Sequence, residues 1–272
     1  MKKLFLSVLA LGFVLCGCRD PYINYSTRVF NDGDNVLPNE LFSGAEESLI
    51  NALAPDGHTP VSCNVFYIWE GDTNKRILID TGYGGALQAK LEEAKISPDA
   101  ITDILITHSH FDHVGGLLAT NGIAAFPNAA VHITAAELDF WRAKNPDQAA
   151  ACEKAYQIAF INPDGKTPVA MPGLVAIDAA GHTPGHVVFL LYGRFFFAGD
   201  LLHSDLLQFA HPEIYPTFDN DKDAAFAMRV KFLNHAAERY WRFHACHIKG
   251  TGQVEKDGDG FNFNTGTYDT HY

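Results

Sequence analysis

The stretch His108-Ser109-His110-Phe111-Asp112-His113, which directly follows the apolar residues 104–106, decides how this sequence is interpreted. It places three imidazoles and one carboxylate within six residues, and these side chains are common ligands of divalent transition metals. Side-chain packing does not require four such groups in this order. The stretch therefore predicts a metal site.

We expect these ligands to lie on a tight loop at the end of a strand. Residues 103–107 are predicted to form a short buried strand, and residues 114–118 to open a helix. Side chains two residues apart in extended backbone point the same way, so His108 and His110 can reach one metal. Asp112 and His113 lie where the chain turns into the helix and can reach another. The spacing therefore allows two metals.

Further ligand-type side chains follow downstream. Gly-His-Thr-Pro-Gly-His at residues 181–186 precedes a predicted hairpin, strands 187–191 and 195–198, which Gly199 and Asp200 follow. His247 comes after a predicted strand at residues 240–245. The combination H-x-H-x-D-H, G-H-T-P-G-H, A-G-D and a late histidine resembles the metallo-β-lactamase superfamily over most of residues 55–255.

The resemblance implies a dinuclear site in which Asp112 and Asp200 are the catalytic carboxylates. His244 is the alternative to His247 as the late ligand, and the two would lie on opposite faces of a strand because they are three residues apart. The implied ligands are His108, His110 and His186 for the first metal, Asp112, His113 and His247 for the second, and Asp200 as the bridge.

Other side chains are expected to support the ligands or line the pocket. Asp80, in the element Asp80-Thr81-Gly82, matches a family element whose carboxylate supports the metal loop. Phe111, His203 and His211 are candidates for the pocket, the two histidines because related enzymes line it with the residues after the A-G-D motif. We expect His182 to hold its loop rather than to bind metal.

The ligand set predicts hydrolysis. Two divalent cations about 3.5–4 Å apart can share a water, lower its pKa and direct the resulting hydroxide at an electrophilic carbonyl or phosphorus. Asp200 can accept or pass on a proton as the intermediate breaks down. Nitrogen and carboxylate ligands suit zinc, and the same set accepts manganese, cobalt or iron.

Several activities fit such a site. Residues 199–237 resemble the methyl parathion hydrolase-like branch, which includes lactonases and arylesterases, so a lactone, ester or phosphotriester hydrolase is the first hypothesis. A β-lactamase is an alternative that Asp200 disfavours, because typical β-lactamase sites lack a bridging carboxylate there. A glyoxalase-like thioesterase is disfavoured by predicted export away from cytosolic thiols. A mononuclear iron dioxygenase or a non-enzymatic metal-binding lipoprotein would not need Asp112, His113 and Asp200.

The amino terminus predicts export. Lys2 and Lys3 precede an apolar run, residues 4–15, that is shorter than a preferred membrane span and typical of a secretory signal. Leu15-Cys16-Gly17-Cys18 resembles the lipobox of bacterial lipoproteins, which implies a lipidated Cys18 and anchoring to a membrane of the cell envelope, in the periplasm. We therefore expect a signal peptide at residues 1–17, a tether at 18–40 and one domain at 41–272.

Composition narrows the class of partner. Without residues 1–17 the chain carries 18 basic against 32 acidic residues, a formal charge of −14, and no Lys/Arg cluster is visible in the sequence. Nucleic acid is thus disfavoured, and a small-molecule substrate is expected. Apart from Cys16 and Cys18 of the signal, three cysteines remain, Cys63, Cys152 and Cys246, and this odd number predicts no disulfide framework.

The order of predicted elements favours an α/β (α+β) fold, the αββα sandwich in which two mixed sheets lie between helix layers. A helix at residues 147–160 is expected either to cap the pocket, with Phe160 and Ile161 as an apolar wall, or to pack in the core. Thr134 is placed to cap a helix, and the tail from residue 257 is expected to be loop with a possible terminal strand. The other predicted elements are strands 65–69, 76–80, 131–133 and 175–178 and helices 85–94, 135–143 and 221–237.

Overall fold

The computed structural model describes residues 24–266. The expected signal peptide and Cys18, the expected site of lipidation, lie outside these residues, so export and anchoring stay predictions. Within the described part of the chain, no helix is both long enough and apolar enough to cross a bilayer.

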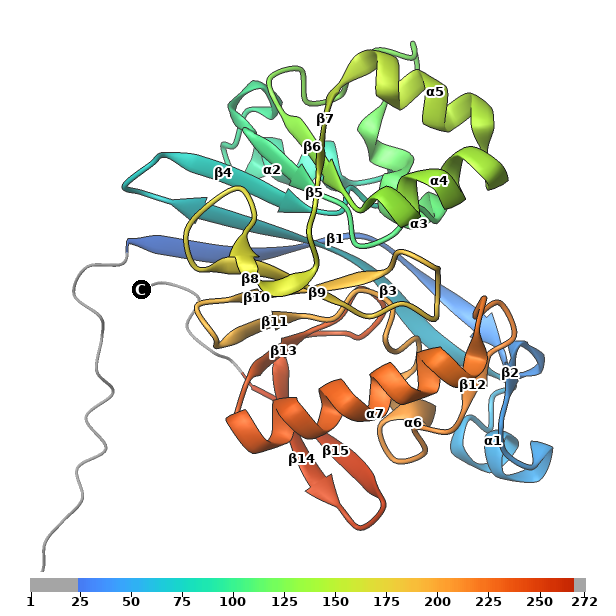
Figure 1. Ribbon diagram of the computed structural model, residues 1–272. Coiled ribbons are helices and arrows are strands. Elements are labelled where there is room, and N and C mark those ends of the chain that lie inside the picture. The colour runs from blue at the N-terminus through green and yellow to red at the C-terminus, as the bar shows by residue number, and fades with distance from the viewer. Residues whose placement is uncertain (1–23, 267–272) are drawn as a thin grey trace, which may run out of the picture.

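The first sheet has six strands in the order β1-β3-β4-β5-β6-β7. β1, β3 and β4 pair in antiparallel fashion, whereas β4, β5, β6 and β7 run parallel. Helices α2, α3, α4 and α5 lie over its outer face (Figure 1). The elements are β1 (Tyr25–Pro38), β3 (His58–Glu70), β4 (Lys75–Ile79), β5 (Asp103–Leu105), β6 (Ala130–Ile133), β7 (Gln157–Phe160), α2 (Leu87–Glu93), α3 (Phe111–Val114), α4 (Ala135–Lys144) and α5 (Pro146–Ala155).

The second sheet has seven strands in the order β15-β14-β13-β11-β10-β9-β8. Only β11 and β13 pair in parallel in this sheet. The long helix α7 covers its outer face (Figure 1). The elements are β8 (Asp164–Pro168), β9 (Leu174–Asp178), β10 (Val187–Leu191), β11 (Phe195–Phe197), β13 (Arg242–His244), β14 (Gly252–Asp257), β15 (Gly260–Thr265), α6 (Asp205–Gln208) and α7 (Lys222–Arg239).

A small two-stranded sheet, β2 (Phe42–Ser43) with β12 (Tyr215–Pro216), lies beside α1 (Glu47–Leu53). Three short 3-10 helices complete the described chain, at Asn39–Leu41, Pro98–Ala100 and Gly115–Leu117.

Three apolar layers hold the four structural layers together. Between the sheets, the rings of Phe66 and Phe197 lie 5.2 Å apart. Trp141 of α4 is buried against the outer face of the first sheet. Phe232 of α7 stacks on Phe196 of the second sheet at 5.4 Å. Burial of these surfaces is the main favourable term in folding, and the predicted αββα sandwich is confirmed.

Side chains cap two helices, and one of these caps was predicted from the sequence. The Thr134 hydroxyl accepts a hydrogen bond from the backbone N–H of Glu137, as predicted for α4. Asp221 caps α7 by accepting bonds from the backbone N–H groups of Asp223 and Ala224.

Two expectations were wrong. Residues 25–38 were expected to be part of a tether. They form the edge strand β1, because pairing with β3 buries Tyr25 and Phe30. The predicted helix 147–160 ends at Ala155, since the segment after it adds β7 to the edge of the first sheet. Phe160 is exposed and Ile161 packs between the sheets, so neither is a pocket wall.

The parallel strands bring the predicted ligands and the residues that support them to one edge of the sheets. Asp80 follows β4, His108 follows the end of β5, and Thr134 follows β6. In the second sheet Asp200 follows β11 and His247 follows β13. Carboxyl ends of neighbouring parallel strands meet at the same edge of a sheet, so residues distant in sequence converge there.

Asp103 lies at the opposite end of the strands, where its buried carboxylate stabilises the first sheet. Its oxygens lie 2.7 Å from Lys75 Nζ and 2.8 Å from His132 Nε2. Burial opposes its ionisation, but the bonds to His132 and Lys75 outweigh burial and lower the pKa to about 2.

We expect Asp103→Asn to lower the free energy of unfolding at pH 7 by about 2 kcal/mol, because one pKa unit corresponds to about 1.4 kcal/mol. This stabilisation is present above the unfolded pKa near 4 and is lost as the pH falls towards 2. Urea unfolding at several pH values should show the two proteins converging below pH 3. A difference that is the same at pH 7 and pH 2.5 would contradict the role of charge.

Candidate metal centre

The first cluster of ligand-type groups contains His108, His110, His182 and Asp200. His110 Nδ1 lies 3.0 Å from His108 Nε2 and 2.9 Å from His182 Nε2. Asp200 Oδ2 lies 3.6 Å from His108 Nε2 and 3.4 Å from His182 Nε2. Four possible ligand atoms thus surround one point.

The second cluster shares Asp200 with the first and adds His113, His247 and Cys246. His113 Nε2 lies 3.1 Å from Asp200 Oδ1, and His247 Nε2 lies 3.0 Å from Asp200 Oδ2. Asp112 Oδ2 is 3.7 Å from His113 Nε2 and 3.4 Å from His247 Nε2. Asp200 therefore lies between the two clusters, where a bridging group would have to be.

The second nitrogen of several rings is held by a fixed acceptor. Asp80 Oδ2 lies 2.8 Å from His113 Nδ1, and Asp219 Oδ1 lies 2.7 Å from His182 Nδ1. The Ser62 carbonyl is 2.9 Å from His247 Nδ1. Such partners set the tautomer and leave each Nε2 lone pair directed at the centre.

Asp219 is itself positioned by Arg229, a guanidinium buried beneath the site. Arg229 Nε donates to the Leu201 carbonyl and Nη1 to the carbonyls of Pro212 and Ile214, while Nη2 lies 3.4 Å from Asp219. The ring of His182 is thus fixed through a chain of buried polar groups.

These groups fit divalent metal ions. His113 Nε2 and Asp200 Oδ1 are buried with no hydrogen-bond partner, although they lie close together. Unpaired buried polar atoms are costly, so their convergence points to a ligand. Ligand atoms around a tetrahedral zinc are roughly 3.3 Å apart, since each lies about 2.0–2.1 Å from the ion. The separations in both clusters are of this size.

The buried negative charge of Asp200 also requires positive charge beside it. Burial disfavours its ionisation, but His113, His247 and His108 outweigh burial and hold the pKa of the Asp200 carboxyl well below its usual range. Burial likewise opposes protonation of His247, yet Asp200 and Asp112 raise its pKa to about 9. Burial dominates at His108 and His182, where the pKa lies well below 6.5. Protons or metal cations must balance the buried carboxylate.

His186 is not part of the first cluster, in which the family resemblance had placed it. Its Nδ1 is 3.1 Å from the Ala179 carbonyl, and its Nε2 accepts a hydrogen bond from the backbone N–H of Asp200. Both ring nitrogens therefore have backbone partners, and His182 takes the place expected for His186 in the first cluster. The spacing could not separate the two, because the turn at residues 183–185 decides which ring points inward.

The structure separates the two candidates for the late ligand. His247 joins the second cluster, whereas His244 lies between the sheets, stacked 5.0 Å from Phe197, with its Nδ1 3.0 Å from the Thr251 hydroxyl. The loop 245–247 after β13 carries the chain from the core to the site.

A pocket of about 360 Å³ opens over both clusters. Phe111 and His203 line it as predicted, and His203 Nε2 lies 3.1 Å from Asp200 Oδ2. His211 does not line it and pairs instead with Glu213 at 3.1 Å. The remaining lining residues, Asn35, Leu37, Val61, Tyr83 and Phe218, were not expected, and two of them come from the unpredicted strand β1.

Glu137 was also missed, although it connects the two ligand loops. Its carboxylate accepts bonds from the backbone N–H and the hydroxyl of Ser109, from the Thr183 hydroxyl and from the backbone N–H of Gly185. Gly185 must be glycine, because a Cβ there would collide with the Glu137 backbone. The capping pattern Thr134-x-x-Glu137 was the available signal.

Comparison with known proteins agrees with this architecture. Residues 58–234 match the family model described as the Metallo-beta-lactamase superfamily. This match covers more than half of the chain, and the chain belongs to that superfamily.

Two curated relatives are hydroxyacylglutathione hydrolases. That of Pectobacterium atrosepticum is 28% identical over 141 residues, which are 51% of this chain and 47% of the relative. That of Cronobacter sakazakii is 30% identical over 140 residues, with the same shares. The chain thus spans about half the length of these relatives.

Solved structures resemble the chain over most of its length. AidC, a dizinc quorum-quenching lactonase in complex with a product, N-hexanoyl-L-homoserine, has a TM-score of 0.78 and 24% identity, covering 92% of this chain and 100% of AidC. The hydrolase AbOPH has a TM-score of 0.77 and 24% identity, covering 90% and 96%. These similarities establish the fold.

The two histidines of the G-H-T-P-G-H segment give a matched pair of variants. We expect His182→Ala to lose one equivalent of metal, because it removes a group directed at the first cluster. His186→Ala should keep both equivalents and lower only the melting temperature. Metal content after dialysis, measured by mass spectrometry, distinguishes them, and loss from His186→Ala alone would reinstate the original assignment.

Glu137→Gln should weaken metal binding about 10- to 100-fold, as is typical for groups that hold ligands in place. All four partners of the carboxylate donate, so the amide NH2 faces donors it cannot pair with. Asp139→Asn on the exposed face of the same helix is the control. Titration of the metal-free proteins with zinc gives the affinities, and equal affinities would show that Glu137 does not organise the loops.

Proposed function

We propose that this protein is a metal-dependent hydrolase that opens the ring of a lactone bearing an aliphatic acyl chain. The observation that carries this proposal is the pair of ligand clusters sharing Asp200 beneath an apolar-walled pocket. The superfamily match supports the hydrolase class, and the solved lactonase structures share the fold.

In this proposal two divalent ions, most simply zinc, are bound at the clusters. Manganese, cobalt or iron would suit the same nitrogen and oxygen donors. Such ions supply an activated water and polarise a carbonyl oxygen. The proposed ligands are His108, His110 and His182 for the first ion, Asp112, His113 and His247 for the second, and Asp200 for both.

Asp112 is placed to transfer protons at the pocket, and Tyr83 lies near it. Asp112 is the more exposed of the two carboxylates at the site, and its side chain lines the pocket. It can take the proton of the attacking water and return it to the ring oxygen that leaves. Burial, with Asp112 nearby, raises the pKa of Tyr83 to about 12, so the phenol stays neutral at the pocket wall.

The pocket walls favour a neutral acyl substrate. Leu37, Val61, Phe111 and Phe218 offer apolar surface for an aliphatic chain beside the carboxylates and imidazoles of the two clusters. The lining includes Asp112 and Asp200 but no Lys or Arg. A lactone or an aryl ester carries no charge that needs a cation, and a neutral phosphotriester is the next choice.

Hydroxyacylglutathione is the second candidate, because the curated relatives are hydroxyacylglutathione hydrolases. Its glutathione part carries carboxylates, for which the pocket lining provides no Lys or Arg partner. The same argument applies to the carboxylate of a penicillin. We therefore expect both compounds to be poorer substrates than a lactone.

A panel of substrates tests the proposal. Initial rates are measured with zinc-, manganese- and cobalt-loaded protein on N-hexanoyl homoserine lactone, an aryl acetate, a methyl phosphotriester, S-lactoylglutathione and a penicillin. We expect the highest kcat/KM for the lactone, at least tenfold above the thioester and the penicillin. Predominant thioester hydrolysis would establish the second candidate, and two bound metals with no turnover of any compound would exclude this substrate range.

A further inference from the structure

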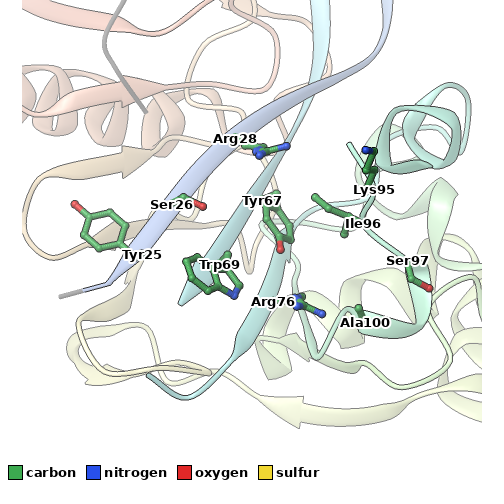
Figure 2. A pocket seen from close by; sticks show the side chains of 10 residues that line it. All are labelled: Tyr25, Ser26, Arg28, Tyr67, Trp69, Arg76, Lys95, Ile96, Ser97 and Ala100. Atoms are coloured by element: carbon green, nitrogen blue, oxygen red, sulfur yellow. The ribbon is translucent and has the colours of Figure 1, made fainter. Parts of the chain in front are cut away.

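Two cysteines beside the metal centre have no part in the proposed reaction. A separate pocket of about 510 Å³ is lined by residues of β1, β3 and β4 and of the segment after α2 (Figure 2). Its lining includes no Cys, His, Asp or Glu, so it offers neither a thiol nor a metal ligand. Cys63 and Cys246, in contrast, lie where both kinds of group meet.

Cys63 lies in β3 and Cys246 in the loop after β13, and a hydrogen bond joins their thiols. The backbone N–H of Asn64 donates to the Cys246 carbonyl at 3.0 Å. The backbone N–H of Ser62 donates to the His247 carbonyl at 3.1 Å. These bonds, on either side of Cys63, hold the two segments side by side like neighbouring strands.

This arrangement suits a disulfide. A disulfide needs Cα atoms about 4.4–6.8 Å apart and side chains that point toward each other. Neighbouring strands place facing residues about 4.5–5.5 Å apart. The hydrogen bond between the thiols shows that the side chains of Cys63 and Cys246 meet. Cys152 is buried in α5, in the layer on the outer face of the first sheet, and serves as a comparison.

Both cysteines are connected to the second ligand cluster. Cys63 Sγ donates to the Asp112 carbonyl at 3.3 Å. Because this bond uses the hydrogen of Cys63, the thiol of Cys246 must supply the hydrogen of the bond between the two sulfurs. Cys246 directly precedes His247, and its Sγ lies within 4.8 Å of the ligand atoms of His113 and His247. A change at the sulfurs therefore acts on the segment of Asp112 and on His247.

We propose that Cys63 and Cys246 form a disulfide whose closure weakens metal binding at the second cluster. The oxidant is a small disulfide such as glutathione disulfide. One cysteine attacks it and releases a first glutathione thiol, and the other cysteine then displaces the second glutathione from the mixed disulfide. The two cysteines lose their hydrogens, which the two glutathione thiols carry. The inference rests on the proposed metal ligands and not on the substrate.

Closure changes the surroundings of two proposed ligands. Oxidised Cys63 has no S–H, so the Asp112 carbonyl loses this hydrogen bond. Two sulfurs in a hydrogen bond are farther apart than the roughly 2.05 Å of a disulfide, so closure also draws Cys246, and with it His247, towards β3. Loss of groups that hold ligands in place typically lowers metal affinity about 10- to 100-fold. By linkage, a bound metal opposes closure by the same factor.

Peptide mapping identifies this cross-link directly. Trypsin cleaves after Lys and Arg, which places Cys63, Cys152 and Cys246 in three different peptides, residues 29–75, 145–154 and 243–249. The full chain, metal-free or zinc-loaded, is equilibrated with mixtures of reduced and oxidised glutathione. Both cysteines are 1% exposed, so the same mixtures are also applied during refolding from urea, when the thiols are accessible. Free thiols are then alkylated, and mass spectrometry identifies linked peptides.

We expect peptides 29–75 and 243–249 to be linked in the metal-free protein. With saturating zinc, half-closure should need an oxidant ratio about 10- to 100-fold higher. The oxidised protein should bind its second zinc more weakly by the same factor, and dithiothreitol should restore the affinity. Cys152→Ala should respond to the oxidant like the unmodified chain. Cys63→Ser, which keeps a donor for the Asp112 carbonyl, should not respond.

Three results would each overturn the proposal. The first is that Cys63 and Cys246 are both alkylated after native and refolding treatment at every oxidant ratio. The second is that the linked peptides contain Cys152. The third is a link between Cys63 and Cys246 that leaves the zinc affinity unchanged. Peptide masses and zinc affinity are measured without turnover, so this proposal and the proposed lactone hydrolysis fail or succeed separately.

Discussion

The buried carboxylate of Asp200 is the constraint on which the site depends. A charge removed from water is costly unless other charges and hydrogen bonds compensate it. Here the compensation comes from His113, His247 and His108, which hold its pKa low, and from bound cations in the proposed holoenzyme. Two of the rings around it, those of His113 and His182, are fixed from the far side by the buried carboxylates of Asp80 and Asp219.

The two sheets contribute unequally to this arrangement, and one side chain joins them. The loop after β5 brings most of the candidate ligands, whereas the segment before β10 brings His182. Glu137 accepts hydrogen bonds from both segments, so the distance between them is set by a helix of the first half of the chain. Formation of the centre is thereby coupled to packing of the halves, which favours a preorganised site over one assembled by the metal.

The sequence predicted the features of the structure that depend on local residue patterns. Six consecutive residues located the ligand loop, and alternation and capping located most strands and helices within a few residues. It assigned His186 rather than His182 to the first cluster, because the two histidines share one motif and their directions depend on a turn that packs against Glu137. It also missed β1, since an edge strand with exposed residues on one side and many polar residues resembles a tether until its partner β3 is known.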